Sequence, residues 1–437
     1  MKVAFHTLGC KVNQYETEAM KEQFARGGYQ IVGEDDFADV YIVNTCTVTN
    51  MADRKSRQFI RHAGKINPEA LVAVTGCYAQ MKPDEVSAIE GVEVVAGTDE
   101  KHHMLDFVND YISQHAATIS IKPYDQLSEY EDLGVIDAME SRTRAFIKIQ
   151  EGCNRFCSYC IIPYARGKVR SRDEGEILRE VRGLVDKGYR EIVLTGINTA
   201  LYGADKGELA IEPLIARLNV IEGDFRIRLS SLEPTVIDAE FVKGLLGYEK
   251  LCHHLHLSIQ SGSDRILGFM DRHYTREDYL EIVNVLRDFD PHYGISTDII
   301  VGFPGETEDD FQDSVAMTRE TQFCKVHAFK YSMRSGTKAA EMGGQISGEV
   351  KNQRSEELIE VAEATAEHFF DSSVGDTRRV LFETCEDKMI TGYTDNYIKV
   401  YAEGDETMFN ELCEVRLLKK YKDGMLGEIT HGQERSR

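Results

Sequence analysis

The stretch "EGCNRFCSYC", residues 151–160, places three cysteines within eight positions, at Cys153, Cys157 and Cys160. Zinc sites usually pair cysteines as C-x2-C and need a second pair to close the tetrahedron, and no matched pair follows here. Three thiolates on one loop can instead hold three irons of a [4Fe–4S] cluster, whose usual ligand set is four thiolates. The missing fourth ligand would leave one iron open to a substrate or cofactor. Structural zinc and a chance spacing are the alternatives.

The chain around this loop alternates between short apolar runs and helical stretches, which indicates βα units. Six runs are strand candidates: 145–150, 191–196, 226–231, 254–260, 295–303 and 325–332. Helical patterns such as "YTREDYLEIVNVLRDF" (274–289) separate them. Six βα units predict a partial, open (βα)6 barrel, with its active site at the carboxyl ends of the strands. The cysteine loop follows the first of these strands.

Four β-branched runs in the first hundred residues, 3–10, 40–46, 71–77 and 92–98, predict a parallel, Rossmann-like α/β sheet. Three of them end in a cysteine: Cys10, Cys46 and Cys77, which are 36 and 31 residues apart. Because strands of a parallel sheet end at one edge, we expect the three thiols to converge there. Gly9, Thr45 and Gly76 just ahead of them favour a ligand role. Three buried structural cysteines are the alternative.

Changes in hydrophobic periodicity and charge along the sequence predict four segments. They are an N-terminal domain (1–118), an acidic, exposed connection (119–142), a barrel domain (143–371) and a small β-domain (372–437). The connection carries six acids against one lysine over 122–141. The last segment alternates in hydrophobicity and contains turn signals, which is typical of a small β-barrel that grips nucleic acid.

The composition limits the partners and the compartment. The 437 residues carry a net charge of −23, which argues against bulk attraction to nucleic acid and leaves two local basic stretches, 53–62 and 164–172, as candidate RNA contacts. The start, "MKVAFHTLGC", shows no secretory h-region, so we expect no leader; ten cysteines would then indicate metal or redox chemistry. No run of eighteen apolar residues is present, so we expect a cytoplasmic protein without a membrane partner.

The cysteine loop at the first strand of a (βα)6 series resembles the radical S-adenosylmethionine (SAM) enzymes. Together with the N-terminal trio and the terminal β-domain, the whole chain resembles one branch, the radical-SAM methylthiotransferases, in which the last domain is TRAM-like. "CIIPYARGKVRSR" (160–172) and "GFPGETEDDF" (302–311) are similarly family-like. The resemblance implies a radical-generating [4Fe–4S] cluster on Cys153, Cys157 and Cys160 and an auxiliary [4Fe–4S] cluster on Cys10, Cys46 and Cys77.

Within this family, "HTLGCKVNQYETEAM" (6–20) resembles the MtaB-type enzymes. The isopentenyladenosine relatives carry a "YGCQMN"-like motif there, and the ribosomal-protein relatives a "LGCPKN"-like one. The resemblance implies methylthiolation of adenine C2 in N6-threonylcarbamoyladenosine at tRNA position 37, with one SAM as methyl donor and a second cleaved reductively. It also implies the tRNA anticodon loop as partner and an electron donor such as flavodoxin or ferredoxin; we expect a monomer. An isopentenyladenosine or ribosomal-protein methylthiotransferase and a non-catalytic Fe–S RNA-binding protein are the alternatives.

The other candidate residues lie mostly at strand ends. Seven are expected to contact SAM, although plain turns would explain several of them: Tyr159, Gly196, Asn198, Ser231, Glu233, Ser258 and Gln260. Arg166 and Arg170 would either pair with an anion or form a solvated basic face. Packing is expected for His253, His254 and His256, and a structural role for Cys252, Cys324, Cys385 and Cys413. The basic residues of 378–383 and 419–420 are candidate phosphate contacts.

Overall fold

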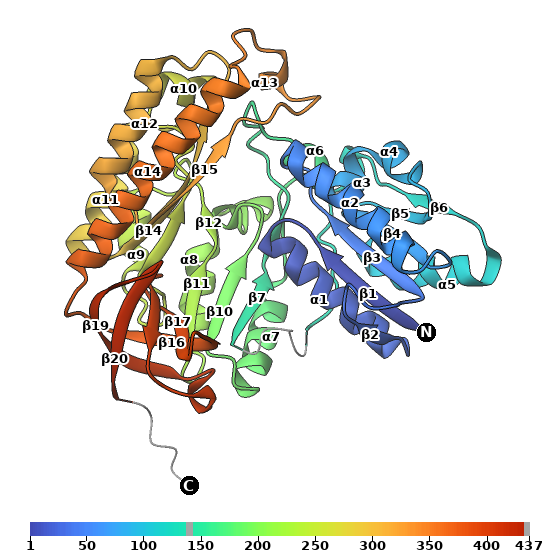
Figure 1. The fold of residues 1–437 in the computed structure, drawn as a ribbon, viewed down its shortest axis with the longest axis horizontal. Coiled ribbons are helices and arrows are strands. Elements are labelled where there is room, and N and C mark those ends of the chain that lie inside the picture. The colour runs from blue at the N-terminus through green and yellow to red at the C-terminus, as the bar shows by residue number, and fades with distance from the viewer. Residues whose placement is uncertain (137–142, 432–437) are drawn as a thin grey trace.

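The computed structural model describes residues 1–136 and 143–431. The last six residues of the predicted connection and the last six of the chain lie outside the described residues. A parallel α/β domain, a partial barrel and a small closed β-barrel follow one another along the chain (Figure 1). This architecture confirms the fold class predicted from the sequence. None of the helices in the described ranges combines the length and apolarity needed to cross a membrane.

The N-terminal domain is a six-stranded parallel sheet in the order β2-β1-β3-β4-β5-β6. Its strands are β1 (Lys2–Thr7), β2 (Gln30–Val32), β3 (Val40–Thr45), β4 (Leu71–Gly76), β5 (Val92–Ala96) and β6 (Thr118–Ser120). Its helices are α1 (Lys11–Arg26), α2 (Asn50–Ile66), α3 (Cys77–Met81), α4 (Pro83–Ser87) and α5 (Met104–Gln114), the last preceded by the 3-10 turn η1 (Lys101–His103). The edge strands β2 and β6 were not predicted, because three residues are too few to show a periodicity.

Both faces of this sheet are buried, which explains why its strands read as continuous apolar runs. Alternate residues of β3 illustrate the arrangement. Tyr41 and Val43 pack with Ile60 of α2, whereas Val40 and Ile42 pack with the helices α1 and α5 on the other face. The sheet therefore lies between two helical layers, and its carboxyl edge is left for the loops that carry the cysteines.

The middle domain confirms the six predicted parallel strands. They are β7 (Arg144–Lys148), β10 (Glu191–Thr195), β11 (Arg226–Leu229), β13 (His254–Leu257), β14 (Gly294–Val301) and β15 (Lys325–Lys330). Hydrogen bonding divides them into a sheet β11-β10-β7 and a sheet β12-β13-β14-β15, where β12 is Ser231–Leu232. An isolated parallel bridge pairs Ile227 of β11 with Leu251, which precedes β13 by three residues. A short antiparallel pair, β8 (Gln150–Glu151) and β9 (Arg170–Ser171), flanks the cysteine loop.

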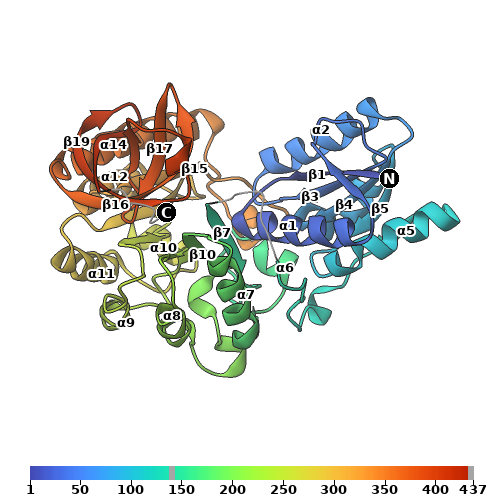
Figure 2. The ribbon, with the colours of Figure 1, turned by 90° about the horizontal axis from the view of Figure 1, so that it is seen from below.

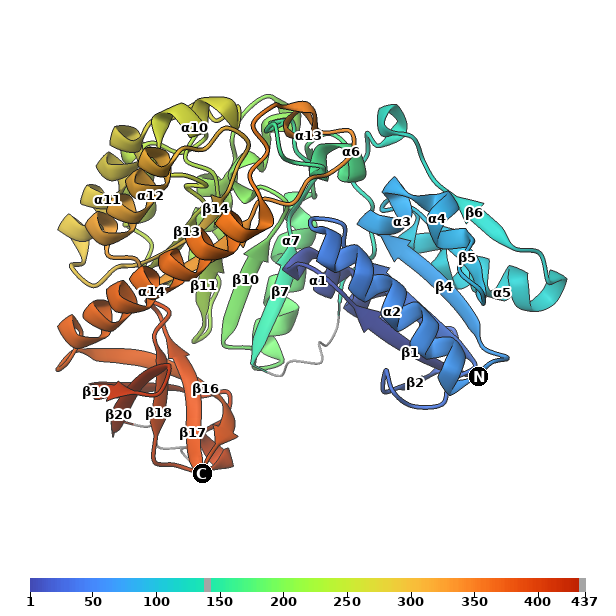
Figure 3. The same cartoon turned by 45° about the horizontal axis from the view of Figure 1, so that its top comes forward.

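Amphipathic helices cover the outside of this partial barrel, and capping boxes start two of them, at Thr275 and Thr307. The helices are α6 (Ile162–Arg166), α7 (Glu174–Asp186), α8 (Ile211–Asn219), α9 (Ala239–Leu245), α10 (Asp264–Phe269), α11 (Arg276–Phe289), α12 (Glu308–Thr321), α13 (Lys338–Glu341) and α14 (Gly348–Ser372). The 3-10 turns are η2 (Tyr124–Gln126), η3 (Thr199–Leu201) and η4 (Ala204–Lys206). The long helix α14 packs on α12 and β15 and leads to the terminal domain (Figure 3).

The C-terminal domain is a closed barrel in the order β16-β17-β18-β20-β19, seen end-on in Figure 2. Its strands are β16 (Thr377–Glu386), β17 (Met389–Thr394), β18 (Lys399–Ala402), β19 (Leu412–Tyr421) and β20 (Gly424–His431), with the 3-10 turn η5 (Glu406–Met408). Closure leaves no free sheet edge. The barrel packs against β11: Arg226 donates to the Arg379 carbonyl and Arg228 to the Thr394 carbonyl.

The acidic connection is not the exposed segment that its charge suggested. Over its described part, Leu127, Leu133 and Ile136 are buried. The Tyr130 hydroxyl donates to the carbonyl of Lys148, and Glu131 pairs with His102. The apolar residues of this segment hold it against both domains while its acids are paired or face solvent. The domain boundaries themselves stay predictions.

Candidate active site

The loop that carries Cys153, Cys157 and Cys160 runs from β8 to α6, at the carboxyl end of the first barrel strand. Its backbone is held tightly: the Cys160 amide donates to the Cys157 carbonyl at 2.9 Å, and Cys153 donates to the Gly167 carbonyl at 3.1 Å. Phe156 adopts a left-handed conformation with φ 49°, which is unusual for an aromatic residue. Its ring packs edge-on against Tyr164 and Tyr124, which supports this conformation.

Charged side chains meet beside this loop around one carboxylate, Glu233. Arg272 donates to the Cys157 sulfur at 3.3 Å and pairs with Glu233 at 3.0 Å. Arg155 reaches the same carboxylate at 3.2 Å, and the Asn198 amide donates to it at 2.6 Å. Sequence reasoning named Glu233 and Asn198 but missed Arg272, because no motif spacing links it to the cysteines.

The predicted SAM contacts lie at the ends of neighbouring strands. Gly196 and Ser231 line one cavity. The backbone amide of Asn198 donates to Oε1 of Gln150, another residue that sequence reasoning missed. The buried side-chain Oδ1 of Asn198 accepts no hydrogen bond within the described chain. The neighbouring Ser230 hydroxyl is also buried without a partner among these residues.

The three remaining predicted SAM contacts are Tyr159, Ser258 and Gln260. Tyr159 packs against an apolar cluster that includes Phe303. The Ser258 hydroxyl donates to Asp298 at 3.1 Å, and Gln260 has a left-handed φ of 69° at the end of β13. The structure therefore brings all seven residues to the carboxyl ends of the strands, which is the arrangement that the (βα)6 prediction required.

The N-terminal cysteines converge at the carboxyl edge of the other sheet, as expected. Cys10 precedes α1, Cys46 follows β3, and Cys77 begins α3. The glycines beside them are required by the geometry. A Cβ on Gly9 (φ 116°) would lie 2.9 Å from the Cys46 Cβ, and one on Gly76 (φ 95°) would lie 2.4 Å from the Thr45 carbonyl oxygen. Close backbone approach is what brings the three loops together.

Burial raises the pKa of four of these thiols, Cys10, Cys46, Cys153 and Cys160, which makes them difficult to ionise without a metal. Burial raises the pKa of Cys46 to about 12 and that of Cys153 to about 11. A cation at either trio would therefore have to displace protons, as iron and zinc do when they bind cysteine. Each trio also has a buried arginine at one sulfur: Arg272 at Cys157, and Arg166, whose Nε donates to the Cys77 sulfur at 3.2 Å. Such donors stabilise thiolates and tune cluster potentials.

A buried ionic network joins the two domains next to Cys77. Glu16 of α1 accepts from Arg166 at 2.7 Å and from Lys148 at 3.0 Å, and pairs with Lys101 at 3.3 Å. Glu151 pairs with Arg166 at 2.9 Å and with Lys148 at 2.7 Å. The five side chains are at most 2% exposed and carry three positive charges against two negative ones. The surplus positive charge suits an anionic thiolate-bound cluster beside Cys77.

We expect Glu16→Gln to lower the free energy of unfolding by about 3–5 kcal/mol at neutral pH, because it leaves buried cations without their carboxylate. Although burial opposes ionisation, Arg166, Lys101 and Lys148 hold the pKa of Glu16 well below its usual value. Its stabilisation is therefore present above a pH of about 4.5 and is lost as the pH falls further, so the difference from wild type should shrink in acid. Urea denaturation at several pH values measures this.

Glu22→Gln on the same helix is the matched control, since Glu22 pairs with Arg26 at the partly exposed i,i+4 spacing. Its expected cost is about 0.3–0.5 kcal/mol. Equal effects of the two substitutions would show that the buried network does not stabilise the domain interface.

A cavity of about 510 Å³ lies between the N-terminal domain and the inner face of the barrel. Gly9, Cys10 and Lys11 line it from one side, and the strand residues Gly196 and Ser231 from the other. Tyr397 of the terminal barrel also contributes to its wall. The cavity thus connects one cysteine of the N-terminal trio to the strand ends that carry the predicted SAM contacts.

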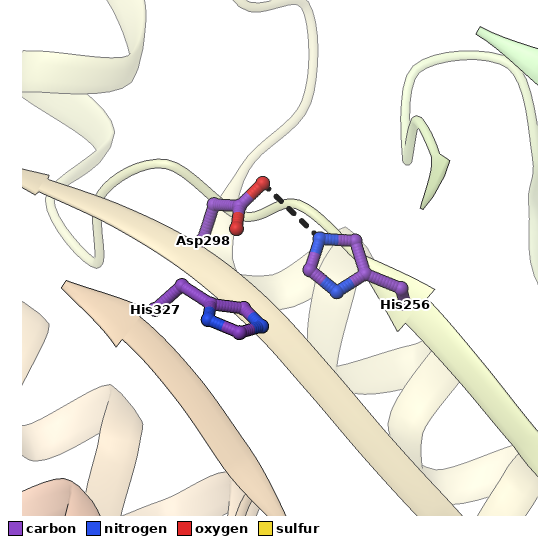
Figure 4. Close-up of side chains that lie close together, drawn as sticks. All are labelled: His256, Asp298 and His327. Atoms are coloured by element: carbon purple, nitrogen blue, oxygen red, sulfur yellow. Dashed lines mark hydrogen bonds and ion pairs between the residues drawn. The ribbon is translucent and has the colours of Figure 1, made fainter. Parts of the chain in front are cut away.

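Three polar side chains on β13, β14 and β15 project into this cavity: His256, Asp298 and His327 (Figure 4). Their ligand atoms lie within 4.8 Å of one another. His256 hydrogen-bonds to Asp298 at 3.1 Å. The prediction that His256 is a packing residue is therefore wrong. His254 also lines the cavity, where it stacks on Tyr397, whereas His253 stacks on Tyr293 outside it. Strand alternation places neighbouring histidines on opposite faces.

Most of the basic stretch 164–172 is unavailable to RNA, contrary to the prediction. Arg166, Arg170 and Arg172 are at most 2% exposed. Arg170 pairs with Asp99 at 2.7 Å, and Arg172 pairs with Glu180. These arginines bind the N-terminal domain and the connection to the barrel. A solvated basic face, one of the two readings of Arg166 and Arg170, is thereby excluded.

Of the other basic residues and cysteines considered in the sequence, some are exposed and others are buried or paired. In the stretch 53–62, which lies on α2, Arg54, Lys55 and Arg61 are exposed. Arg378 and Arg379, by contrast, pair with Asp290 and Asp224. Of the four remaining cysteines, Cys252, Cys324 and Cys413 are buried, and Cys385 is exposed, which does not fit a structural thiol.

The sequence matches known families over both larger domains. Residues 147–318 match the Radical SAM superfamily and residues 2–97 match the Uncharacterized protein family UPF0004. A relative named threonylcarbamoyladenosine tRNA methylthiotransferase MtaB, from Bacillus subtilis (strain 168), is 42% identical over 99% of this chain and 97% of its own length. A protein of the same name from Aquifex aeolicus (strain VF5) is 41% identical over 92% of this chain and 97% of its own length.

Two further comparisons are more distant. A tRNA-2-methylthio-N(6)-dimethylallyladenosine synthase of Clostridium botulinum (strain Hall / ATCC 3502 / NCTC 13319 / Type A) is 34% identical over 97% of this chain and 95% of its own length. Among solved structures, the radical S-adenosylmethionine methyltransferase TsrM from Kitasatospora setae superposes with a TM-score of 0.59 at 16% identity, over 78% of this chain and 77% of its own. This likeness shows the shared fold alone.

Membership of the radical SAM superfamily brings SAM and a [4Fe–4S] cluster to the barrel. The residues present fit these groups, since Arg272 and Glu233 link the three-thiol loop to Asn198, whose Oδ1 is buried without a partner among the described residues. The near-complete match to the MtaB proteins extends the assignment across the N-terminal domain. With two matched domains and two cysteine trios on one chain, this protein belongs to the radical-SAM methylthiotransferases, in the MtaB-type group.

Proposed function

We propose that this protein converts N6-threonylcarbamoyladenosine at tRNA position 37 into its 2-methylthio form. The observation that carries the proposal is the shared cavity, in which Cys10 of the N-terminal trio faces the strand ends of the radical SAM barrel. An adenine held there could meet both cysteine sites. The relatives named for this substrate are 37–42% identical to the chain, against 33–35% for those named for dimethylallyladenosine.

The proposal assigns the barrel cluster to Cys153, Cys157 and Cys160 and a second, auxiliary [4Fe–4S] cluster to Cys10, Cys46 and Cys77. When bound, these groups and SAM would supply the radical and the methylthio sulfur. The chain's own residues bind and orient: Arg272 donates to the Cys157 thiolate, and Arg166 donates to Cys77. Asn198, Ser231 and Glu233 are assigned to SAM, as are Tyr159, Gly196, Ser258 and Gln260.

The same proposal places the anticodon loop at the cavity, because single-stranded bases can be splayed out and read on their edges. Exposed Arg54, Lys55 and Arg61 of α2 supply a local positive surface on a chain of net charge −23. We assign phosphate contacts to this helix and to the TRAM-like barrel, where Lys419 is exposed. RNA affinity should therefore fall with salt. A cytoplasmic monomer reduced by a flavodoxin- or ferredoxin-type donor completes the proposal.

Comparing tRNA nucleosides from cells with and without the gene tests this function directly. Mass spectrometry should find 2-methylthio-N6-threonylcarbamoyladenosine lost and its unmethylthiolated precursor accumulated in the deletion strain, and a plasmid copy should restore the product. Loss of methylthiolated isopentenyladenosine, or of a methylthiolated ribosomal peptide, would instead assign one of the two alternative substrates. An unchanged profile of all three would contradict the proposal.

A further inference from the structure

The polar wall of the 510 Å³ cavity contains one cation, Lys11, that has no anionic partner among the residues the structure describes. Lys11 follows Cys10 directly and lines the cavity. Within the described chain, no carboxylate pairs with it and no hydrogen bond engages its ammonium group. A half-buried ammonium group without a counterion loses hydration and gains nothing in return. Such a group is expected to be matched by an anion of the ligand.

The other charged groups of the wall are already satisfied. Arg228 donates to Glu191 at 2.9 Å and to the carbonyls of Asp395 and Thr394. Asp298 accepts from Ser258 and is bonded to His256. Lys11 is therefore the charge that is left for a ligand, with His327 beside it as a polar group whose ring makes no hydrogen bond within the described residues.

A metal ion is the competing occupant, because two histidines and one aspartate are a known ligand set for divalent cations. The charges nearby oppose it. Lys11 and Arg228 line the same cavity, and both would repel a divalent cation at Asp298. The wall is built for an anion rather than for a cation.

We infer that Lys11, with His327 and His256 beside it, binds the carboxylate of the threonylcarbamoyl group and thereby selects an anionic N6 substituent. This inference rests on the proposed function, because the substituent belongs to that substrate. The chemistry of the base supports it. C2 and C6 of adenine both flank N1, so C2 and the N6 substituent share one edge of the base. An adenine whose C2 faces the Cys10 site would direct its N6 substituent along the wall that carries Lys11.

The test compares two anticodon stem-loop RNAs with the reconstituted enzyme, one with the free acid of N6-threonylcarbamoyladenosine and one with its neutral methyl ester. Wild type should favour the acid in kcat/KM by roughly 10- to 100-fold, the range of a charge-assisted hydrogen bond. Lys11→Gln should reduce turnover of the acid by a similar factor and bring the acid-to-ester ratio close to one. Lys11→Arg should restore the preference, and Lys21→Gln, on the same helix outside this cavity, should keep it.

The controls separate the possible failures. An unchanged acid-to-ester ratio in a Lys11→Gln enzyme that retains its iron would overturn the pocket and leave the proposed function standing. If the Lys11→Gln enzyme loses its iron, the acid-to-ester ratio in kcat/KM of the wild-type enzyme is the test. Equal turnover of acid and ester by wild type would then contradict carboxylate binding by Lys11. Wild-type enzyme that methylthiolates neither RNA would overturn the proposed function as well. Stoichiometric zinc that disappears in His327→Ala, with no acid preference in wild type, would assign the metal site instead.

Discussion

Replacing Cys153, Cys157 and Cys160 together with alanine is expected to abolish the formation of 5′-deoxyadenosine from SAM under reducing conditions. Without the three thiolates the barrel has no ligands for its cluster, and Arg272 loses the sulfur to which it donates. Reconstituted wild type should hold about eight irons, and this variant about four. Iron analysis and chromatography of the SAM products measure both effects.

The matched control replaces three cysteines outside the trios, Cys252, Cys324 and Cys385, with alanine. Two of these are buried and one is exposed, so the control reports the general cost of removing cysteines. It should keep about eight irons and should still cleave SAM. A Cys153/Cys157/Cys160 variant that still produced 5′-deoxyadenosine would show that the radical is generated elsewhere.

Replacing Cys10, Cys46 and Cys77 with alanine is expected to separate the two half-reactions. SAM cleavage at the barrel should persist, because the Cys153 loop and the strand ends are intact. Methylthiolated RNA should fall below detection, since the sulfur-carrying site is lost. The iron content should again be about four. The measurements are mass spectrometry of the RNA product and 5′-deoxyadenosine formation by the same sample.

This second variant also tests the less specific reading of the N-terminal trio, in which it consists of buried structural thiols. On that reading the variant would be less stable but would keep its full iron content and some methylthiolation. The retention of all iron, or of product, would therefore contradict an auxiliary cluster. A thermal melt should accompany the assay, because the loop contacts at Gly9 and Gly76 are tight and a folding defect has to be recognised as such.

The sequence allowed the strands and the cysteine sites to be predicted because both depend on local order. Buried parallel strands read as apolar runs, and a residue directly after such a run lies at the sheet's carboxyl edge. Cys46 and Cys77 follow β3 and β4 immediately, so their convergence followed from the pattern alone. The three-residue strands β2 and β6 were missed since they are too short to carry a period.

The partners of charged side chains could not be predicted, because they come from elements far apart in the chain. The arginines at 166, 170 and 172 looked like a basic surface, but Arg166 is buried against Glu16 and Arg170 against Asp99, which are 150 and 71 positions away. Arg272 reaches Cys157 across 115 positions. No spacing in the sequence records such contacts.

The sequence by itself determined the two cysteine trios, the parallel strands that present them and the family to which they belong, since each can be recognised from short motifs, such as an apolar run with a cysteine directly after it. Only the tertiary structure decided which charged side chains form ion pairs within the protein and which remain available to bind a ligand. Arg166 forms ion pairs with Glu16 and Glu151, whereas Lys11 lines the cavity and remains available to a ligand. The physical reason is that burial and pairing depend on the separate elements that pack around a side chain, and these meet only when the chain has folded.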